Sequence, residues 1–340
     1  MDTVILRYDE IALKSPPVRR RFEDILKKNV VKMLGKRRAK ITKEGGRFFI
    51  KIDEPAKIAK LLSNIPGVSS TSPARSVEAG MEEIVAAAVE LAEKILSPKE
   101  TFAVRTTRHG KHPFSSNDIN RAAGSKILST VIGAKVDLDN PDHEIFIEIR
   151  GDRAYIFSEH IRGIGGLPVG SQGKVIVISE DGEIESAVLM LKRGCEVALL
   201  SGGHKRPKVL TAAKRLLKHH HRIELFLAPK ISLKADPSLR FYLEKVFMRK
   251  VASLLAEEIG AGAIVSGETI EDISRIGLRG LKLIDSVASL EVFYPLLLEE
   301  PGKIDVDQNL YNALEKAIKK LSVPPDIMSK LKKIVLEAEE

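Results

Sequence analysis

The N-terminal segment of the chain alternates short apolar strands with amphipathic helices. Residues 4–6 form an apolar run, and residues 47–53 place apolar side chains at every second position, as in a half-buried strand. Apolar residues at helical spacing fill residues 18–33, and Ser15 just before them is a favoured N-cap. This order predicts an α+β unit of ferredoxin-like type over residues 1–74.

A second unit with a different order of elements is expected over residues 75–168. We expect helices at residues 84–95 and 119–128 and strands at residues 101–107, 144–150 and 153–158. Helices repeat at 3.6 residues and strands at two, which distinguishes the two kinds of element. The two units together predict an α+β N-terminal half.

The C-terminal half, residues 169–340, alternates apolar runs with helical segments. Four runs, each short enough for one buried strand, occupy residues 174–178, 196–200, 223–227 and 263–265. This alternation predicts a doubly wound parallel sheet of the α/β class. Beyond Pro301 we expect two charged amphipathic helices, separated by Pro324 and Pro325.

Positive charge is concentrated near the N-terminus. The chain carries a net charge of +9, and residues 7–47 alone hold 14 Lys and Arg against 5 Asp and Glu. Many of these cations lie off the apolar stripe of their helix. Such a surface predicts affinity for a polyanion such as RNA, with strong salt dependence. A solvated helix face on a thermophile-like protein explains the same charge.

The composition argues against several other classes of protein. A single cysteine, Cys195, allows no intramolecular disulfide and no cysteine-based zinc site, and we expect it to be a buried packing residue. The N-terminus shows no basic segment followed by an apolar one, and no apolar run is long enough to cross a bilayer. We expect a cytoplasmic protein with no membrane partner and no metal site.

Residues 101–121 combine basic, aromatic and capping residues in an order that suits phosphate binding. A strand carrying arginine is followed by a loop with lysine and phenylalanine, and then by a helix that starts near Asn117. Helix N-terminal N–H groups and cationic side chains both favour phosphate. Phe114 either stacks on a base at an RNA end or packs at the junction of loop and helix.

A second candidate site is the loop between the apolar run 175–178 and the next helical segment. A strand, a tight loop and a helix in that order are the usual setting for a phosphate cradle, with backbone N–H groups aimed at the anion. The loop consists of Ser179, Glu180, Asp181, Gly182 and Glu183. Two of its carboxylates, those of Glu180 and Asp181, would face an anion bound there with like charge.

Several motifs resemble the 4-thiouridine synthetases of tRNA, the ThiI family. The opening at residues 7–15 is similar to the start of their ferredoxin-like domain. The strand, loop and helix from Phe102, together with residues 136–155, resemble a THUMP domain. The stretch from Gly166 to Gly194 is similar to their PP-loop ATP-pyrophosphatase lobe.

The resemblance implies a ferredoxin-like domain at residues 1–74, a THUMP domain at 75–168 and a PP-loop ATP-pyrophosphatase-like domain at 169–340. It also implies that the first two domains bind the acceptor arm and 3′ end of tRNA. The residues expected to bind RNA are Lys14, Arg19, Arg21, Arg105, Arg108, Lys111, Phe114, Asn117 and Arg121.

The loop departs from the family pattern, Ser-Gly-Gly-x-Asp-Ser, after its first serine. Glu180 and Asp181 replace the two glycines, and each charge would repel pyrophosphate by about 4 kcal/mol at ~4 Å and an effective dielectric of about 20. The catalytic cysteine pair of the family has no counterpart here. We therefore predict a degenerate nucleotide loop, no catalytic residues and no cofactor.

The predicted function is tRNA binding by a relative of the 4-thiouridine synthetases. Its third domain then serves as a structural platform, a homodimerisation surface or the partner of an active enzyme. The alternative is an ATP-dependent tRNA sulfurtransferase that adenylates uridine, holds Mg²⁺-ATP through the atypical loop and takes sulfur from an external source.

Overall fold

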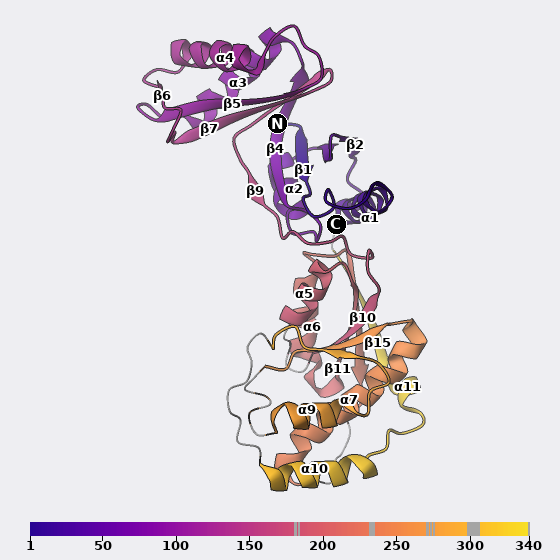
Figure 1. The fold of residues 1–340 in the computed structure, drawn as a ribbon. Helices are drawn as coiled ribbons and strands as arrows, with labels where there is room; N and C mark the ends of the chain where they lie inside the picture. Colours follow the sequence, from indigo (N-terminus) through magenta and orange to yellow (C-terminus); the bar gives the residue numbers. More distant parts are fainter. Residues whose placement is uncertain are drawn as a thin grey trace. The chain divides into compact units, whose positions relative to one another are not determined.

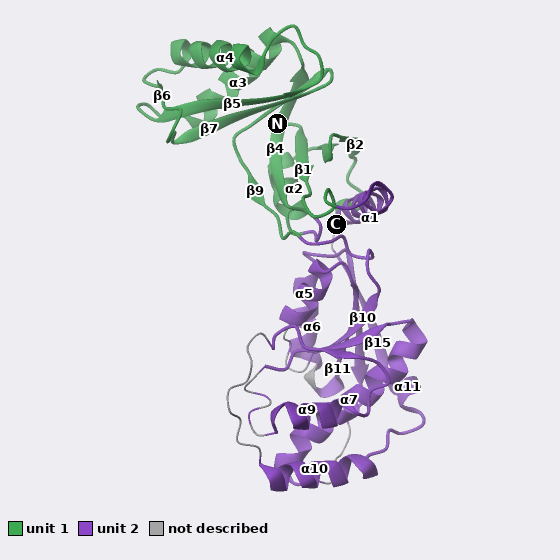
Figure 2. Cartoon of the chain, in the orientation of Figure 1, with its two compact units in different colours: residues 1–13, 34–64, 68–165 green, residues 14–33, 65–67, 166–340 purple. Residues whose placement is uncertain are grey.

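The computed structural model describes residues 1–179, 182, 184–230, 235–269, 272, 274, 276–297 and 307–338 (Figure 1). The chain divides into two compact units (Figure 2). Unit 1 comprises residues 1–13, 34–64 and 68–165, and unit 2 comprises residues 14–33, 65–67 and 166–340. The predicted α+β and α/β fold classes are confirmed. The boundaries of the three domains stay a prediction.

Unit 1 is built on one sheet with the strand order β2-β3-β1-β4-β8-β7-β5-β6, and β9 pairs with β4. Its elements are β1 (Thr3–Arg7), β2 (Lys40–Glu44), β3 (Arg47–Lys51), α2 (Pro55–Leu62), β4 (Ser70–Glu78), α3 (Met81–Ile95), β5 (Thr101–His109), α4 (Ser116–Thr130), β6 (Lys135–Val136), β7 (His143–Arg150), β8 (Arg153–Phe157) and β9 (Ile161–Arg162). Strand β4 makes the sheet continuous, because residues 70–74 pair with β1 and residues 75–78 pair with β8.

The face of this sheet opposite α3 and α4 folds onto itself. Side chains of β7 alternate, so Ile147 enters the core shared with α3 and α4 while Glu148 points to the opposite face. On that face Phe49 of β3 stacks on Tyr155 of β8, with ring centroids 4.3 Å apart. Strands β1 and β4 lie between β3 and β8 in the sheet order, so this contact requires strong coiling of the sheet. We call this surface the coiled face.

Glu148 is the buried charge at the centre of the coiled face. Its carboxylate accepts a hydrogen bond from Arg150 Nε at 2.8 Å, pairs with Arg47 of β3 and lies 3.6 Å from Arg7 Nη2 of β1. Burial lowers the pKa of Arg7 to about 10, although the charge of Glu148 opposes that shift. Because a buried charge is tolerated only when it is paired, Glu148 holds β1, β3 and β7 together.

Unit 2 contains helix α1 and a sheet with the strand order β14-β13-β10-β11-β12-β15. Its elements are α1 (Pro16–Leu34), β10 (Lys174–Ile178), α5 (Glu185–Lys192), β11 (Glu196–Gly202), the 3₁₀ turn η1 (Gly203–Lys205), α6 (Arg206–Leu216), β12 (Arg222–Ala228), α7 (Pro237–Ile259), β13 (Ala263–Ser266), α9 (Gly277–Asp285), β14 (Val292–Phe293), α10 (Gln308–Lys320), α11 (Ile327–Lys330) and β15 (Lys332–Glu337).

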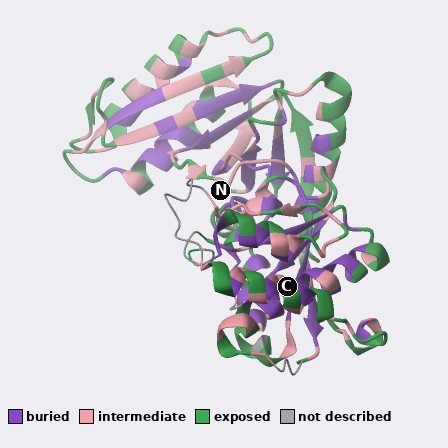
Figure 3. Ribbon diagram, turned by 60° about the horizontal axis from the view of Figure 1, so that its bottom comes forward, coloured by how far each residue is buried: buried purple, intermediate pink, exposed green. Residues whose placement is uncertain are grey.

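The sheet of unit 2 is parallel except for the pair β12–β15, and helices cover both faces. Val177 and Leu199 face the core shared with α5 and α6, whereas Ile178 and Leu200 face the core shared with α7. Figure 3 shows the buried residues running along the strands. Strands β11 and β13 flank β10 on opposite sides, so the topological switch point lies at the carboxyl ends of β10 and β13.

The prediction of a second helix near the C-terminus is wrong, because most of that segment is a strand. Only Ile327–Lys330 is helical, and β15 then pairs antiparallel with β12. Ile334 and Leu336 pack against the core shared with α5 and α6, while Val335 between them is exposed. Pairing with a neighbouring strand therefore outweighs the helical preference of this charged segment.

A second buried charge network lies just beyond the carboxyl end of β13. Glu268 accepts hydrogen bonds from Arg249 Nη2 at 2.6 Å and from Lys245 Nζ at 3.2 Å, and both donors belong to α7. Arg249 Nε also lies 3.4 Å from Asp285 Oδ1 at the end of α9. Burial alone would raise the pKa of Glu268, but the charges of Arg249 and Lys245 lower it to about 2.

Replacing Glu148 by glutamine should destabilise unit 1 strongly. The substitution leaves three guanidiniums around a neutral amide, so we expect a loss of about 3–5 kcal/mol in the free energy of unfolding. Urea denaturation combined with hydrogen exchange in β1, β3 and β7 measures this loss. The control is Glu54→Gln in the exposed pair with Lys57, which should change stability by less than about 1 kcal/mol. Equal effects of the two substitutions would contradict the assignment.

Replacing Glu268 by glutamine should destabilise unit 2 in a pH-dependent way. The folded pKa of about 2 lies below the ordinary value of 4.5. The stabilisation by the carboxylate is therefore complete above pH 4.5 and is lost as the pH falls towards 2. Denaturation of both proteins from neutral pH down to about pH 2.5 should show a difference that shrinks on acidification. A difference that stays constant over this range would overturn the assignment.

Candidate nucleic-acid interface

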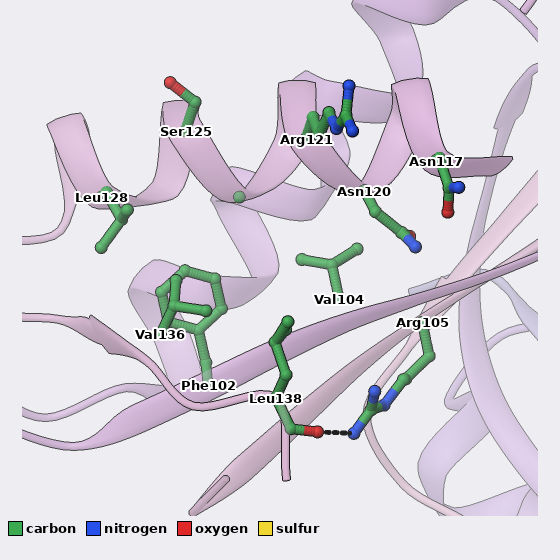
Figure 4. A pocket seen from close by; sticks show the side chains of 11 residues that line it. Phe102, Val104, Arg105, Asn117, Asn120, Arg121, Ser125, Leu128, Val136 and Leu138 are labelled. Carbon is green, nitrogen blue, oxygen red and sulfur yellow. Dashed lines mark hydrogen bonds between the residues drawn. The ribbon is translucent and has the colours of Figure 1, made fainter. Parts of the chain in front are cut away.

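A groove in unit 1 brings several of the predicted residues together. It has a volume of about 580 Å³ and lies along helix α4, over strand β5 and beside β6 (Figure 4). Helix α4 contributes Asn117, Asn120, Arg121, Gly124, Ser125 and Leu128. Strand β5 contributes Phe102, Val104 and Arg105, and the β6 segment contributes Val136 and Leu138. We call this surface the α4 groove.

The local sequence explains why α4 presents one face to the groove. Its lining residues recur at intervals of three or four, so they share a face, while Ile119, Ala123 and Ile127 on another face are buried in the core. The helix is capped by Ser115, whose Oγ accepts a hydrogen bond from Asp118 N–H at 3.2 Å. The helix expected from near Asn117 is therefore confirmed, and its first residue is Ser116.

One end of the α4 groove is polar. Arg105 donates through Nε to Glu144 Oε1 at 3.0 Å and through Nη2 to the Leu138 carbonyl oxygen at 2.6 Å, which holds its guanidinium against the wall (Figure 4). Arg121 and Asn117 are exposed. Asn120 is half-buried, and its Oδ1 atom has no hydrogen-bond partner within the part of the chain that the structure describes.

The other end of the α4 groove is apolar and open to solvent. Figure 4 shows Leu128 facing Val136 and Phe102. Leu128 is 46% exposed and Val136 45%, while Phe102 forms a buried floor. A groove with cations at one end and exposed apolar side chains at the other suits a nucleotide, which has an anionic phosphate and a flat, apolar base.

Three further predicted residues lie near this region but do not line the α4 groove. Arg108 is half-buried near the end of β5, and Lys111 is exposed in the loop that follows. Phe114 packs against the core of α3 and α4 and stacks on His112, with ring centroids 5.6 Å apart. Phe114 thus packs at the junction of loop and helix, and its stacking on a base stays a prediction.

The remaining basic residues predicted to bind RNA belong to unit 2. Lys14 precedes α1, and Arg19 and Arg21 lie in its first turns. Arg19 Nη2 donates to the carbonyl oxygen of Lys14 at 3.4 Å, and Arg21 is exposed. Arg105, Asn117 and Arg121 thus share one groove in unit 1, whereas Lys14, Arg19 and Arg21 all belong to unit 2.

The predicted nucleotide loop is described at Ser179 and Gly182, whereas Glu180, Asp181 and Glu183 lie outside the described residues. Ser179 is buried, and its N–H donates to the Leu200 carbonyl oxygen at 2.9 Å. Gly182 has a φ of +84°, and a side chain there would lie 3.1 Å from the Lys208 carbonyl oxygen of α6. This glycine is therefore required by backbone conformation and by packing.

Other kinds of site find little support in the described ranges. No group of three or more His, Cys, Asp and Glu side chains within them could hold a metal ion. In the same ranges no helix combines the length and apolar character that crossing a membrane requires. Cys195 is buried, as predicted, and burial raises the pKa of its thiol.

Asn120, Gly124 and Leu128 line the groove although they were not among the residues predicted to bind RNA. Their helical spacing with Asn117 and Arg121 is a signal that could have identified them. Val136 and Leu138 offered no such signal. They reach the groove because β6 pairs in parallel with β5, a contact that joins residues more than thirty positions apart.

Comparison with known proteins matches three domain families along the chain. The ThiI ferredoxin-like domain matches residues 3–72, the THUMP domain matches residues 78–159, and the family described as thiamine biosynthesis protein (ThiI) matches residues 170–308.

Among curated relatives is the probable tRNA sulfurtransferase of Methanocaldococcus jannaschii, which is 34% identical over 86% of this chain and 84% of its own length. The probable tRNA sulfurtransferase of Methanothermobacter thermautotrophicus is 35% identical over 87% of this chain and 81% of its own length.

Two solved structures have a similar fold. A crystal structure of a Pyrococcus horikoshii protein superposes with a TM-score of 0.72 and 27% identity, covering 93% of this chain and 99% of the other. A 4-thiouridine synthetase solved with RNA and bound ATP superposes with a TM-score of 0.81 at 24% identity, covering 99% of this chain and 100% of the other. From the identity to its curated relatives over most of their length, the chain belongs to the tRNA sulfurtransferase family, ThiI.

Proposed function

We propose that this protein binds tRNA and that the α4 groove receives the unpaired 3′ end. The observation that carries the proposal is the polarity of the groove: Arg105 and Arg121 lie towards one end, and the apolar pair Leu128 and Val136 lies at the other. An unpaired nucleotide can place its phosphate at the cationic end and its base on the apolar end.

The comparisons support RNA as the class of ligand. The curated relatives are named probable tRNA sulfurtransferases, and the superposed 4-thiouridine synthetase was solved with RNA. The THUMP match covers the whole of the α4 groove. In this proposal Arg108 and Lys111 contact phosphates beside the groove, and Lys14, Arg19 and Arg21 contact the acceptor arm.

We further propose that the PP-loop lobe does not activate ATP. The loop carries Glu180 and Asp181 in place of the family's glycines, so like charges oppose the approach of pyrophosphate. The N–H of Ser179 is already used by the sheet through its bond to Leu200. The lobe then acts as a platform, a dimerisation surface or the partner of an active enzyme.

One observation favours a second function, an ATP-dependent tRNA sulfurtransferase. The chain is at least 34% identical to two proteins named for that activity, over most of their length. In that case Mg²⁺ would have to offset the added carboxylates, and sulfur would have to come from an external source. ATP binding separates the two functions.

The first test is whether the affinity for tRNA depends on its 3′ end. Removing the unpaired 3′ nucleotides should lower the affinity about tenfold or more, because each stacked base contributes about 1–3 kcal/mol. Arg121→Gln should weaken binding of intact tRNA and lower the salt slope by about one.

Lys126→Gln is the matched control, because Lys126 is exposed on α4 and does not line the groove. Fluorescence titration at several salt concentrations measures both quantities. Equal affinity for intact and truncated tRNA would refute the proposed role of the groove.

The second test is thermal unfolding with Mg²⁺-ATP. We expect no shift in the wild-type melting temperature, whereas a ligand at a hundred times its Kd would stabilise the folded state by about 2.7 kcal/mol. The double change Glu180→Gly and Asp181→Gly is the matched variant, because it removes both charges from the loop. A saturable shift in the wild type would establish ATP binding and favour the sulfurtransferase.

A further inference from the structure

Gly124 occupies a position where the fold itself does not require glycine. It lies inside α4, where glycine costs up to about 1 kcal/mol relative to alanine. A Cβ atom built at Gly124 has no atom within 4 Å beyond the surrounding helix backbone. At Gly163, by contrast, a Cβ would collide with the Val68 backbone, and at Gly45 with the Arg150 guanidinium. Packing explains those glycines but not Gly124.

The missing side chain of Gly124 leaves space in the α4 groove. Gly124 lies on the groove-lining face of α4, one turn after Arg121 and one turn before Leu128. It therefore sits between the cationic end and the apolar end. Without a Cβ, the helix backbone at this point is open to close contact by a flat group, at the usual separation of about 3.5–4.0 Å.

A neighbouring polar atom indicates what kind of flat group fits there. Asn120 lies one turn before Gly124 and also lines the groove. Its Oδ1 is buried and has no hydrogen-bond partner among the residues that the structure describes. A buried polar atom without a partner is costly, and amide side chains commonly pair with the edges of nucleobases.

We propose that Gly124 admits a base of the RNA 3′ end, which lies flat on the backbone of α4. The amide of Asn120 then pairs with the edge of that base, and the adjoining phosphate points towards Arg105 and Arg121. From Gly124 the base extends onto the apolar side chains of Leu128 and Val136. This inference rests on the proposed function and assigns the residue that sets the depth of its binding site.

The test is Gly124→Ala, because it separates stability from binding. Alanine is the better helix former, so the melting temperature of unit 1 should rise by about 1–4 °C. The added methyl group should nevertheless lower the affinity for tRNA with an intact 3′ end at least tenfold. The affinity for tRNA that lacks its 3′ end should not change. Gly124→Leu should abolish the advantage of the intact end completely.

Ser129→Ala is the matched control, because Ser129 is exposed on α4, does not line the groove and also gains helix propensity. It should raise stability without changing affinity. If Gly124→Ala stabilises the protein and leaves the affinity for intact tRNA unchanged, the inference is overturned while the proposed function stands. If the wild type itself does not distinguish intact from truncated tRNA, the proposed function fails as well.

Discussion

The arrangement of unit 1 depends on a charged cluster buried where its sheet coils onto itself. The face opposite α3 and α4 is covered by other strands of the same sheet. This coiling brings arginines from β1, β3 and β7 to one carboxylate, that of Glu148. Apolar contacts such as Phe49 on Tyr155 supply burial, whereas the ion pairs specify which strands meet. The cluster therefore joins β1 and β3 to β7 across the coiled face.

The α4 groove takes its position from that sheet. Strand β5, which forms the floor, pairs in parallel with β7 from Phe102 to His109, and the Arg105–Glu144 pair crosses between the two strands. The helix wall is oriented by the apolar residues of α4, which pack against the same strands. A groove built on paired strands and a capped helix is held in shape before any ligand arrives, so little ordering entropy is lost on binding.

In unit 2 the fold of the lobe and the chemistry of its loop are two different matters. Its sheet has the strand order of a doubly wound α/β fold, and the buried Glu268–Arg249 pair joins α7 to the end of β13. The superposition on an ATP-bound 4-thiouridine synthetase is close at low sequence identity. Activity in such lobes resides in a few loop residues at the switch point, and our proposal that this lobe does not activate ATP rests on Glu180 and Asp181 of that loop. Conservation of the fold is therefore compatible with loss of the reaction.

The sequence by itself determined the fold class, most elements and the kind of ligand to expect. Periodicity is a local property, so the strands of the parallel sheet and the capped start of α4 follow from neighbouring residues. Tertiary structure decided what depends on distant pairing. It turned the C-terminal segment around Ile334 into a strand, buried Glu148 among arginines from separate strands, and placed Val136 opposite Leu128. These outcomes depend on which strands pair, and no local pattern encodes that choice because each pairing gains its energy from residues far away in the chain.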